Sequence, residues 1–165
     1  MNAPICEIDV ATGSLCSSCS AKMQSGELEP IDLKVCEFLY KRNSDLSLGP
    51  VDFRKAVESD KAVVVITDSE PGLLIGFGGK IARELSKFLG KHVKVVGSKV
   101  DLNTALSELL TPLRVRGVNT VFRSGGKAFK VRLSRFDEKR LPLPRPVIER
   151  VMKLIYKEPV IFEFE

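Results

Sequence analysis

The segment Gly76-Phe77-Gly78-Gly79 has the residue types of a loop that receives an anionic chain. Glycines let the backbone turn tightly and let a sugar-phosphate chain approach without a Cβ in the way. The helix expected directly after the loop offers free N–H groups and a positive dipole end to a phosphate. Lys80, Arg83 and Lys87 follow at i, i+3 and i+7, which places them together on the polar side of that helix. This spacing predicts a phosphate-binding edge beside which bases can be contacted.

The cysteines could supply a second chemistry, metal binding. Cys16-Ser17-Ser18-Cys19 has the two-residue spacing that grips tetrahedral zinc, and Cys6 precedes it. The first seven residues lack the basic flank and the apolar stretch of a signal peptide, so we expect a cytoplasmic protein. Cysteines in that compartment are more often metal ligands or buried thiols than disulfides.

The composition is that of a folded chain with an uneven charge distribution. With 165 residues, 44% of them hydrophobic and 28% charged, the chain can form one ordinary domain or two to three small ones. No apolar run approaches the roughly 20 residues that span a bilayer, so we expect no membrane association. Between Arg114 and Lys157 thirteen Lys and Arg residues stand against three acids, although the whole chain carries only +5. This local surplus predicts a polyanion-binding face, with a merely solvated surface as the alternative.

A repeat with an offset of 66 residues organises the chain. Helical periodicity over 79–90 recurs over 145–157, and the strand patterns at 63–66 and 93–96 recur at 129–132 and 159–162. The apolar helix positions that correspond are Ile81, Ala82, Leu85, Phe88 and Leu89 in the first unit and Val147, Ile148, Val151, Leu154 and Ile155 in the second.

Each repeat also begins with a helix and a hairpin. The expected helices span 31–40 and 102–110, and the expected hairpins join 51–57 to 61–67 and 114–123 to 127–135. Both units then read α-β-β-(α)-α-β. The predicted fold class is α+β, with helices on one face of each small sheet.

The sequence Ile75-Gly76-Phe77-Gly78-Gly79-Lys80 resembles the Ile-Gly-x-x-Gly step of the KH family. The helix and hairpin before the loop resemble the prokaryotic (type II) KH fold. The paired arrangement, with Leu110-Thr111-Pro112-Leu113-Arg114-Val115 between the units, is similar to that of the archaeal NusA-like proteins. The resemblance implies tandem KH modules at 29–99 and 100–165 that bind single-stranded RNA.

The second unit departs from the KH pattern. Its 66-residue shift puts Pro142-Leu143-Pro144-Arg145 where the glycines should be, and proline fixes φ and lacks an N–H, so this module is degenerate. The cations of its hairpin alternate with apolar residues and predict a basic sheet face or edge suited to phosphates. In the first unit Phe77 occupies a position that is usually basic or polar, and it could stack on a base, dock a partner or be buried.

Residues 1–28 resemble a zinc-ribbon-like module that accompanies some archaeal NusA-like proteins, with paired Cys-x-x-Cys knuckles. In this chain the first knuckle reads Cys6-Glu7-Ile8-Asp9, so the resemblance implies Cys6, Asp9, Cys16 and Cys19 as zinc ligands. Cys36 is an alternative fourth ligand, although its position within a helix favours a buried thiol. A remnant that has lost its metal is the competing interpretation.

The expected function is that of a NusA-like transcription elongation or termination factor with RNA and RNA polymerase as partners. The alternatives are a ribosomal or ribosome-associated RNA-binding protein of the small subunit and a protein-interaction adaptor. We expect no enzyme and no small-molecule substrate, because no Ser-His-Asp set or complete nucleotide loop is present. The expected RNA contacts are Ile75, Gly76, Phe77, Gly78, Gly79, Lys80, Arg83, Lys87, Arg123, Lys127, Lys130, Arg132 and Arg135.

Overall fold

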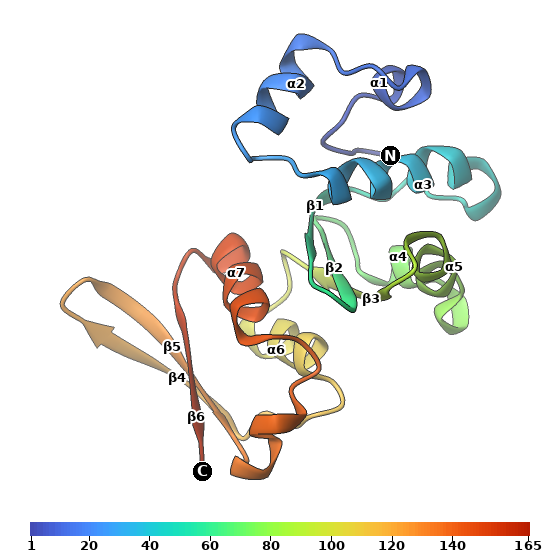
Figure 1. The fold of residues 1–165 in the computed structure, drawn as a ribbon. Coiled ribbons are helices and arrows are strands. Elements are labelled where there is room, and N and C mark those ends of the chain that lie inside the picture. The colour runs from blue at the N-terminus through green and yellow to red at the C-terminus, as the bar shows by residue number, and fades with distance from the viewer. The chain divides into compact units, whose positions relative to one another are not determined.

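The computed structural model describes residues 1–165, which form two compact units, Met1–Lys99 and Val100–Glu165 (Figure 1). Each unit holds one three-stranded sheet together with helices, and this confirms the predicted α+β fold class. None of the helices combines the length and the apolar character needed to cross a membrane.

The first unit contains three strands in the order β1-β2-β3. β1 pairs antiparallel with β2, and β2 pairs parallel with β3, with Val63 opposite Val93. The elements of this unit are α1 (Glu7–Thr12), α2 (Ser17–Gln24), α3 (Pro30–Leu46), β1 (Phe53–Glu58), β2 (Ala62–Thr67), α4 (Gly72–Ile75), the 3₁₀ turn η1 (Phe77–Gly79), α5 (Lys80–Leu89) and β3 (His92–Gly97).

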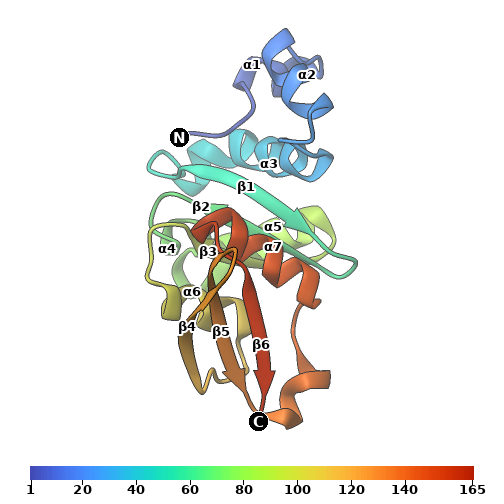
Figure 2. The ribbon, with the colours of Figure 1, turned by 90° about the vertical axis from the view of Figure 1, so that its left-hand side faces the viewer.

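The second unit repeats this pattern of strands. Its sheet has the order β4-β5-β6, again with one antiparallel and one parallel pairing (Figure 2). Phe129 lies opposite Val160, so the parallel pair is shifted by one residue from the expected offset. The elements are α6 (Leu102–Leu110), β4 (Gly117–Arg123), β5 (Gly126–Leu133), the 3₁₀ segment η2 (Arg135–Arg140), α7 (Arg145–Tyr156) and β6 (Val160–Phe164).

The helix ends follow the local signals in the sequence. Pro30 opens α3, and the Asp101 side chain accepts a 3.2 Å hydrogen bond from the Thr104 N–H at the start of α6. Gly90 ends α5 with φ 70°, a conformation that glycine adopts without steric strain. One stripe position was predicted wrongly: Phe88 is 45% exposed, because only one side of its ring packs against the core, where it lies 5.6 Å from the ring centroid of the buried Phe38.

Residues 1–28 belong to the same compact unit as the first sheet. The predicted boundary after residue 28 had treated them as a separate module. Ile5 and Cys19 lie in one hydrophobic core with Val35 and Leu39 of α3. The Tyr40 hydroxyl donates a 2.8 Å hydrogen bond to the Ile5 carbonyl, which adds a polar link. The reason is that α1 and α2 are too short to enclose an apolar core of their own.

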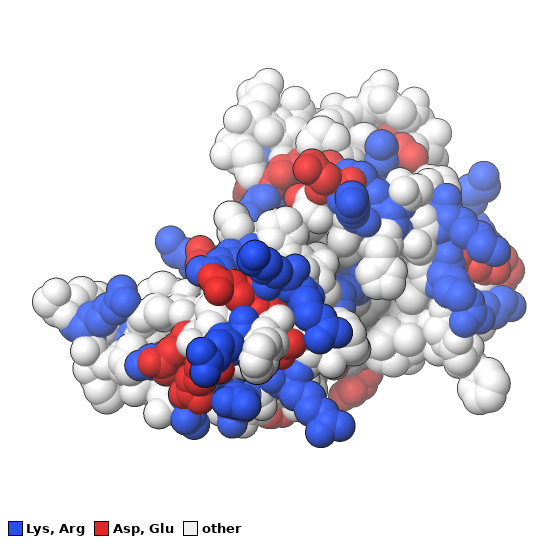
Figure 3. Space-filling model, turned by 60° about the horizontal axis from the view of Figure 1, so that its bottom comes forward, with Lys and Arg blue, Asp and Glu red and all other residues white.

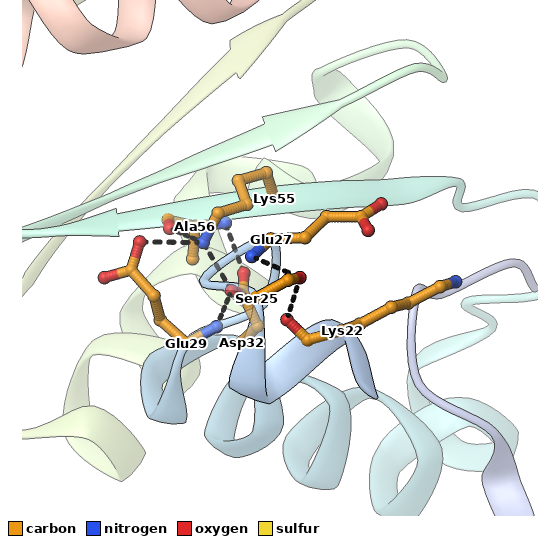
Figure 4. Close-up of polar contacts among 7 residues, drawn as sticks. All are labelled: Lys22, Ser25, Glu27, Glu29, Asp32, Lys55 and Ala56. Carbon is orange, nitrogen blue, oxygen red and sulfur yellow. Dashed lines mark hydrogen bonds and ion pairs between the residues drawn. The ribbon is translucent and has the colours of Figure 1, made fainter. Parts of the chain in front are cut away.

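A buried ion pair joins the start of α3 to β1 (Figure 4). Lys55 of β1 donates from Nζ to the carboxylate of Asp32, which is fully buried, and to Glu29 Oε1 at 3.3 Å. The Asp32 carboxylate also accepts the backbone N–H groups of Glu29 at 2.8 Å and Ala56 at 2.7 Å. Every oxygen of this buried carboxylate is thus hydrogen-bonded, so α3 is held in one position on the sheet.

Candidate nucleic-acid interface and metal centre

The Gly76–Gly79 loop lies between α4 and α5 and has a backbone that requires glycine. Gly76 takes φ 77° and ψ 169°, and a Cβ there would lie 2.7 Å from Ile81 Cγ1 and 2.9 Å from the Ile81 nitrogen. Gly78 and Gly79 follow with φ 61° and φ 78°. Three glycines with positive φ within four residues bring the chain directly onto the start of α5, the positive end of the helix dipole, which favours a phosphate.

The side chains around this loop are exposed. Phe77 is 101% exposed, which excludes the buried structural role considered for it. Ile75, Lys80, Arg83 and Lys87 are exposed as well, so the first-unit residues predicted for RNA contact lie on or beside one accessible loop and helix face. Arg83 Nη1 donates a 2.6 Å hydrogen bond to the Gly78 carbonyl.

The corresponding segment of the second unit has a different backbone. None of residues 142–145 has positive φ, and Pro144 precedes α7 with φ −58° and ψ 143°. The Arg145 guanidinium is 3.1 Å from Glu138 and lies over the Phe164 ring at 4.7 Å. No turn of the glycine-loop kind forms here, because two prolines hold φ negative.

The predicted basic face of the second sheet is largely paired with acids. Lys130 Nζ lies 3.1 Å from Glu163, and Arg132 and Arg116 each lie 3.7 Å from Glu165. These carboxylates follow the basic stretch 114–157 in the sequence, on and just after β6. Because β6 is the parallel neighbour of β5, it brings the acids beside the cations. Lys130 and Arg132 of the predicted basic face therefore each have an acidic partner on β6.

Three predicted cations of the second unit, Arg123, Lys127 and Arg135, are exposed, and the last two lie near aromatic rings. Lys127 Nζ is 5.8 Å from the centroid of the Phe122 ring, and the Arg135 guanidinium is 6.0 Å from that of Phe136. Phe122 and Phe136 are 79% and 78% exposed. Neither phenylalanine was among the predicted site residues. The sequence feature that could have identified them is the pairing of each phenylalanine with a neighbouring arginine, Arg123 or Arg135.

The structure brings the four predicted metal ligands together. One ligand atom from each of Cys6, Asp9, Cys16 and Cys19 lies within 4.8 Å of all the others. Cys6 and Cys16 stand directly before α1 and α2, and Asp9 and Cys19 lie in the first turns of those helices. The two knuckles thus have the same geometry, with each pair of ligands at a helix N-terminus.

The donor atoms fit a tetrahedral metal ion. Zn–S bonds of about 2.3 Å place two sulfurs about 3.8 Å apart, and the Cys6 and Cys19 sulfurs are 3.7 Å apart. The Asp9 carboxylate accepts the Cys16 N–H through Oδ2 at 3.0 Å, and this bond, with those from the Cys19 and Cys16 thiols, lowers its pKa. A carboxylate that stays ionised is suited to a cation.

The Cys19 thiol is held protonated in the absence of metal. A hydrogen bond from the Cys6 backbone lowers the pKa of this thiol, but burial and its bonds with Asp9, Cys16 and Cys6 outweigh it and raise the pKa to about 12. A divalent cation would reverse this balance, because a coordinating thiol is deprotonated outright.

Cys36 lies outside the cluster of ligands. It is fully buried within α3, and burial raises the pKa of its thiol to about 12. The fourth ligand position therefore falls to Asp9, and Cys36 is the buried thiol that its helical position favoured.

The KH domain family model matches residues 41–109, from within α3 to the end of α6. A KH domain is therefore present, and it contains the Gly76–Gly79 loop. The match covers less than half of the chain and leaves most of the second unit outside it.

Curated relatives share part of the chain. Small ribosomal subunit protein uS3 of Dehalococcoides mccartyi is 33% identical over 72 residues, which are 44% of this chain and 24% of that protein. The uS3 protein of Rubrobacter xylanophilus is 32% identical over 73 residues, 42% of this chain and 34% of that protein. That of Pediococcus pentosaceus is 26% identical over 142 residues, 68% of this chain and 63% of that protein. The chain thus spans less than two thirds of the length of these relatives.

Among solved structures, the crystal structure of APE1850 is similar to this chain with a TM-score of 0.49 and 19% identity. The similarity covers 74% of this chain and 96% of the other.

Proposed function

We propose that this protein binds single-stranded RNA at the Gly76–Gly79 loop and that its target is RNA of the small ribosomal subunit. The observation that carries the proposal is the loop itself. Its glycine backbone leads directly into the N-terminus of α5 inside the matched KH domain, and the exposed cations Lys80 and Lys87 follow. Such a loop clamps about four nucleotides by their backbone.

The names of the relatives support the ribosomal alternative better than the NusA-like transcription role expected from the sequence. All three relatives are small-subunit proteins, and none is a transcription factor. The short shared segment means that this chain would share the RNA-binding domain and not the whole architecture of uS3. A binding role without catalysis and a cytoplasmic location belong to the same proposal.

We also propose that the second unit is a degenerate KH module and that the cysteine cluster holds zinc. The repeated strand order and the 66-residue offset support the first of these. Three thiols and one carboxylate whose ligand atoms lie within 4.8 Å of one another support the second, since soft thiolate ligands select zinc over harder cations. Zinc there would be structural, because all four of its positions are filled by protein atoms.

The test of RNA binding replaces Phe77 and Gly78 with aspartates. Both positions are exposed, and aspartate tolerates the left-handed conformation of Gly78 better than most residues, so the fold should survive. Two negative charges at the loop should abolish binding to a short single-stranded RNA, as measured by fluorescence anisotropy. Unchanged affinity in a folded double variant would mean that the RNA site lies elsewhere. Absence of RNA binding in the unaltered protein would favour the protein-interaction adaptor.

A sedimentation experiment in cell extract distinguishes the ribosomal role from the transcription role. The protein should sediment with small ribosomal subunits on a sucrose gradient and leave that fraction in the double-aspartate variant. Sedimentation with RNA polymerase and not with subunits would restore the NusA-like role.

A further inference from the structure

The β4–β5 hairpin ends in a turn that extends away from α7 (Figure 1). Its strands pair continuously from Gly117 opposite Arg132 to Arg123 opposite Gly126 at the tip. Phe122 stands directly opposite Lys127, so the two side chains lie on the same face of the hairpin. The tip is thus rigidly joined to the sheet.

The Phe122 side chain lies on the inner face of the sheet, but no helix or strand covers it. Side chains alternate between faces along a strand, so Phe122 shares its face with Val118, whose partner Val131 is fully buried. At the tip that face is uncovered, and Phe122 is 79% exposed. A large exposed aromatic at an inward-facing position has no role in the core of the domain.

The positive charges at the tip differ from those in the middle of the same sheet. Lys130, Arg132 and Arg116 are paired with carboxylates of β6, whereas no carboxylate lies within 4.0 Å of Arg123 or Lys127. In Figure 3 the charged atoms at the left end, where the hairpin projects, are blue, while red and blue atoms lie side by side nearer the body. The uncompensated charge of this sheet is therefore concentrated at its tip.

We infer that the tip of this hairpin, formed by Phe122, Arg123 and Lys127, is a second contact for single-stranded RNA. The inference rests on the proposed RNA-binding function and assigns it a second site. Lys127, on the same face as Phe122, and Arg123, on the opposite face of the tip, would meet phosphates, and the Phe122 ring would stack on an unpaired base, the combination that single-stranded nucleic acid requires. The glycines at 125 and 126 add a tip without side chains, which lets the RNA backbone approach closely.

The experiment compares two variants of the full chain that each lose two positive charges from the same sheet. Arg123→Gln with Lys127→Gln removes the tip cations, and Lys130→Gln with Arg132→Gln removes the paired ones. Affinity for an unstructured RNA of about 20 nucleotides, several times the four that one loop holds, is measured at several salt concentrations. The tip variant should bind roughly tenfold more weakly at 0.1 M salt, with a salt slope shallower by about 1.4, because two phosphate contacts are lost.

The paired-cation variant should keep nearly the slope of the unaltered protein. Equal loss of slope in both variants would overturn the inference, since the effect would then come from net charge and not from a site. Unchanged binding in the tip variant would overturn it as well and would leave the Gly76 loop as the sole RNA site. If the unaltered protein bound no RNA, the proposed function itself would fail.

An RNA probe that lacks its bases separates the stacking contribution of Phe122 from the phosphate contacts of the cations. Phe122→Ala should weaken binding to the RNA by about tenfold, the loss of one stacked base, and should not change binding to an abasic ribose-phosphate strand. Equal effects on both strands, or no effect on either, would overturn the stacking role. Because Phe122 is exposed, thermal unfolding should be unaffected, and a lower Tm would show a structural role in its place.

Discussion

Arg83 on α5 donates a 2.6 Å hydrogen bond from its guanidinium to the carbonyl oxygen of Gly78, five residues earlier in the chain. One of the three cations beside the glycine loop is therefore already engaged with the loop backbone. Lys80 and Lys87 have no such bond and remain directed to solvent. This difference divides the loop cations into one that positions the turn and two that are available to phosphates.

The first prediction follows from this division. Lys87→Gln should make the salt dependence of RNA binding shallower by about 0.7, the value for one lost phosphate contact on a single strand. Arg83→Gln should weaken binding while changing the salt slope less, because its main loss is the hydrogen bond that orders the loop. Binding titrations at four salt concentrations measure both, and a larger slope change for Arg83→Gln would contradict the positioning role.

The second prediction concerns the glycine backbone. Gly76→Ala should destabilise the first unit by about 2–4 kcal/mol, because the new Cβ would meet Ile81 and the backbone conformation is open almost only to glycine. Gly78→Ala is the matched control, since nothing lies within 4 Å of its Cβ and only a left-handed φ is imposed. Its loss should be about 1 kcal/mol. Urea unfolding monitored by circular dichroism compares the two, and equal losses would contradict the close contact with Ile81.

The third prediction concerns the buried ion pair between α3 and β1. Asp32→Asn should destabilise the first unit by about 3–5 kcal/mol, because it removes the buried carboxylate from Lys55 and leaves only Glu29, at 3.3 Å, as its acidic partner. Glu58→Gln removes an exposed pair with Lys91 in the same unit and should lose less than about 1 kcal/mol. Both changes keep the shape of the side chain. Similar losses in the two variants would show that the Asp32–Lys55 pair contributes little to stability.

The fourth prediction concerns the metal. Protein prepared without chelators should contain about one zinc per chain, as expected for one four-ligand structural site. Cys16→Ser or Cys19→Ser should release the zinc, whereas Cys36→Ser should retain it, because Cys36 lies outside the cluster. Mass spectrometry of the metal content decides between these outcomes, and absence of zinc from the unaltered protein would favour the metal-free remnant.

Removal of the metal should also lower the Tm of the first unit. Ile5 and Cys19 belong to the same hydrophobic core as Val35 and Leu39, so loosening the cysteine segment loosens that core. A Tm that stayed constant on chelation, in protein shown to have lost its zinc, would mean that residues 1–28 contribute no stability to the rest.

Much of the fold was predictable because its signals are local. The α6 boundaries, the glycine end of α5 and the hairpin turn, expected at 124–126 and found at 124–125, follow from caps, prolines and glycines that act within a few residues. The 66-residue offset was visible because the period of a helix stripe or of a strand is written directly in the order of apolar residues. The glycine loop belongs to the same class, since its conformation depends on which residues lack a Cβ.

The tertiary structure decided the relationships between residues that lie far apart in the chain. It placed Glu163 and Glu165 beside Lys130 and Arg132, because parallel pairing joins strands separated by a whole helix, and this moved the available charge from the sheet face to the hairpin tip. It placed Asp9, and not Cys36, within 4.8 Å of the other three candidate ligand atoms. Charge neutralisation and ligand sets depend on distances of a few ångströms in space, and the sequence determines these only through the complete fold.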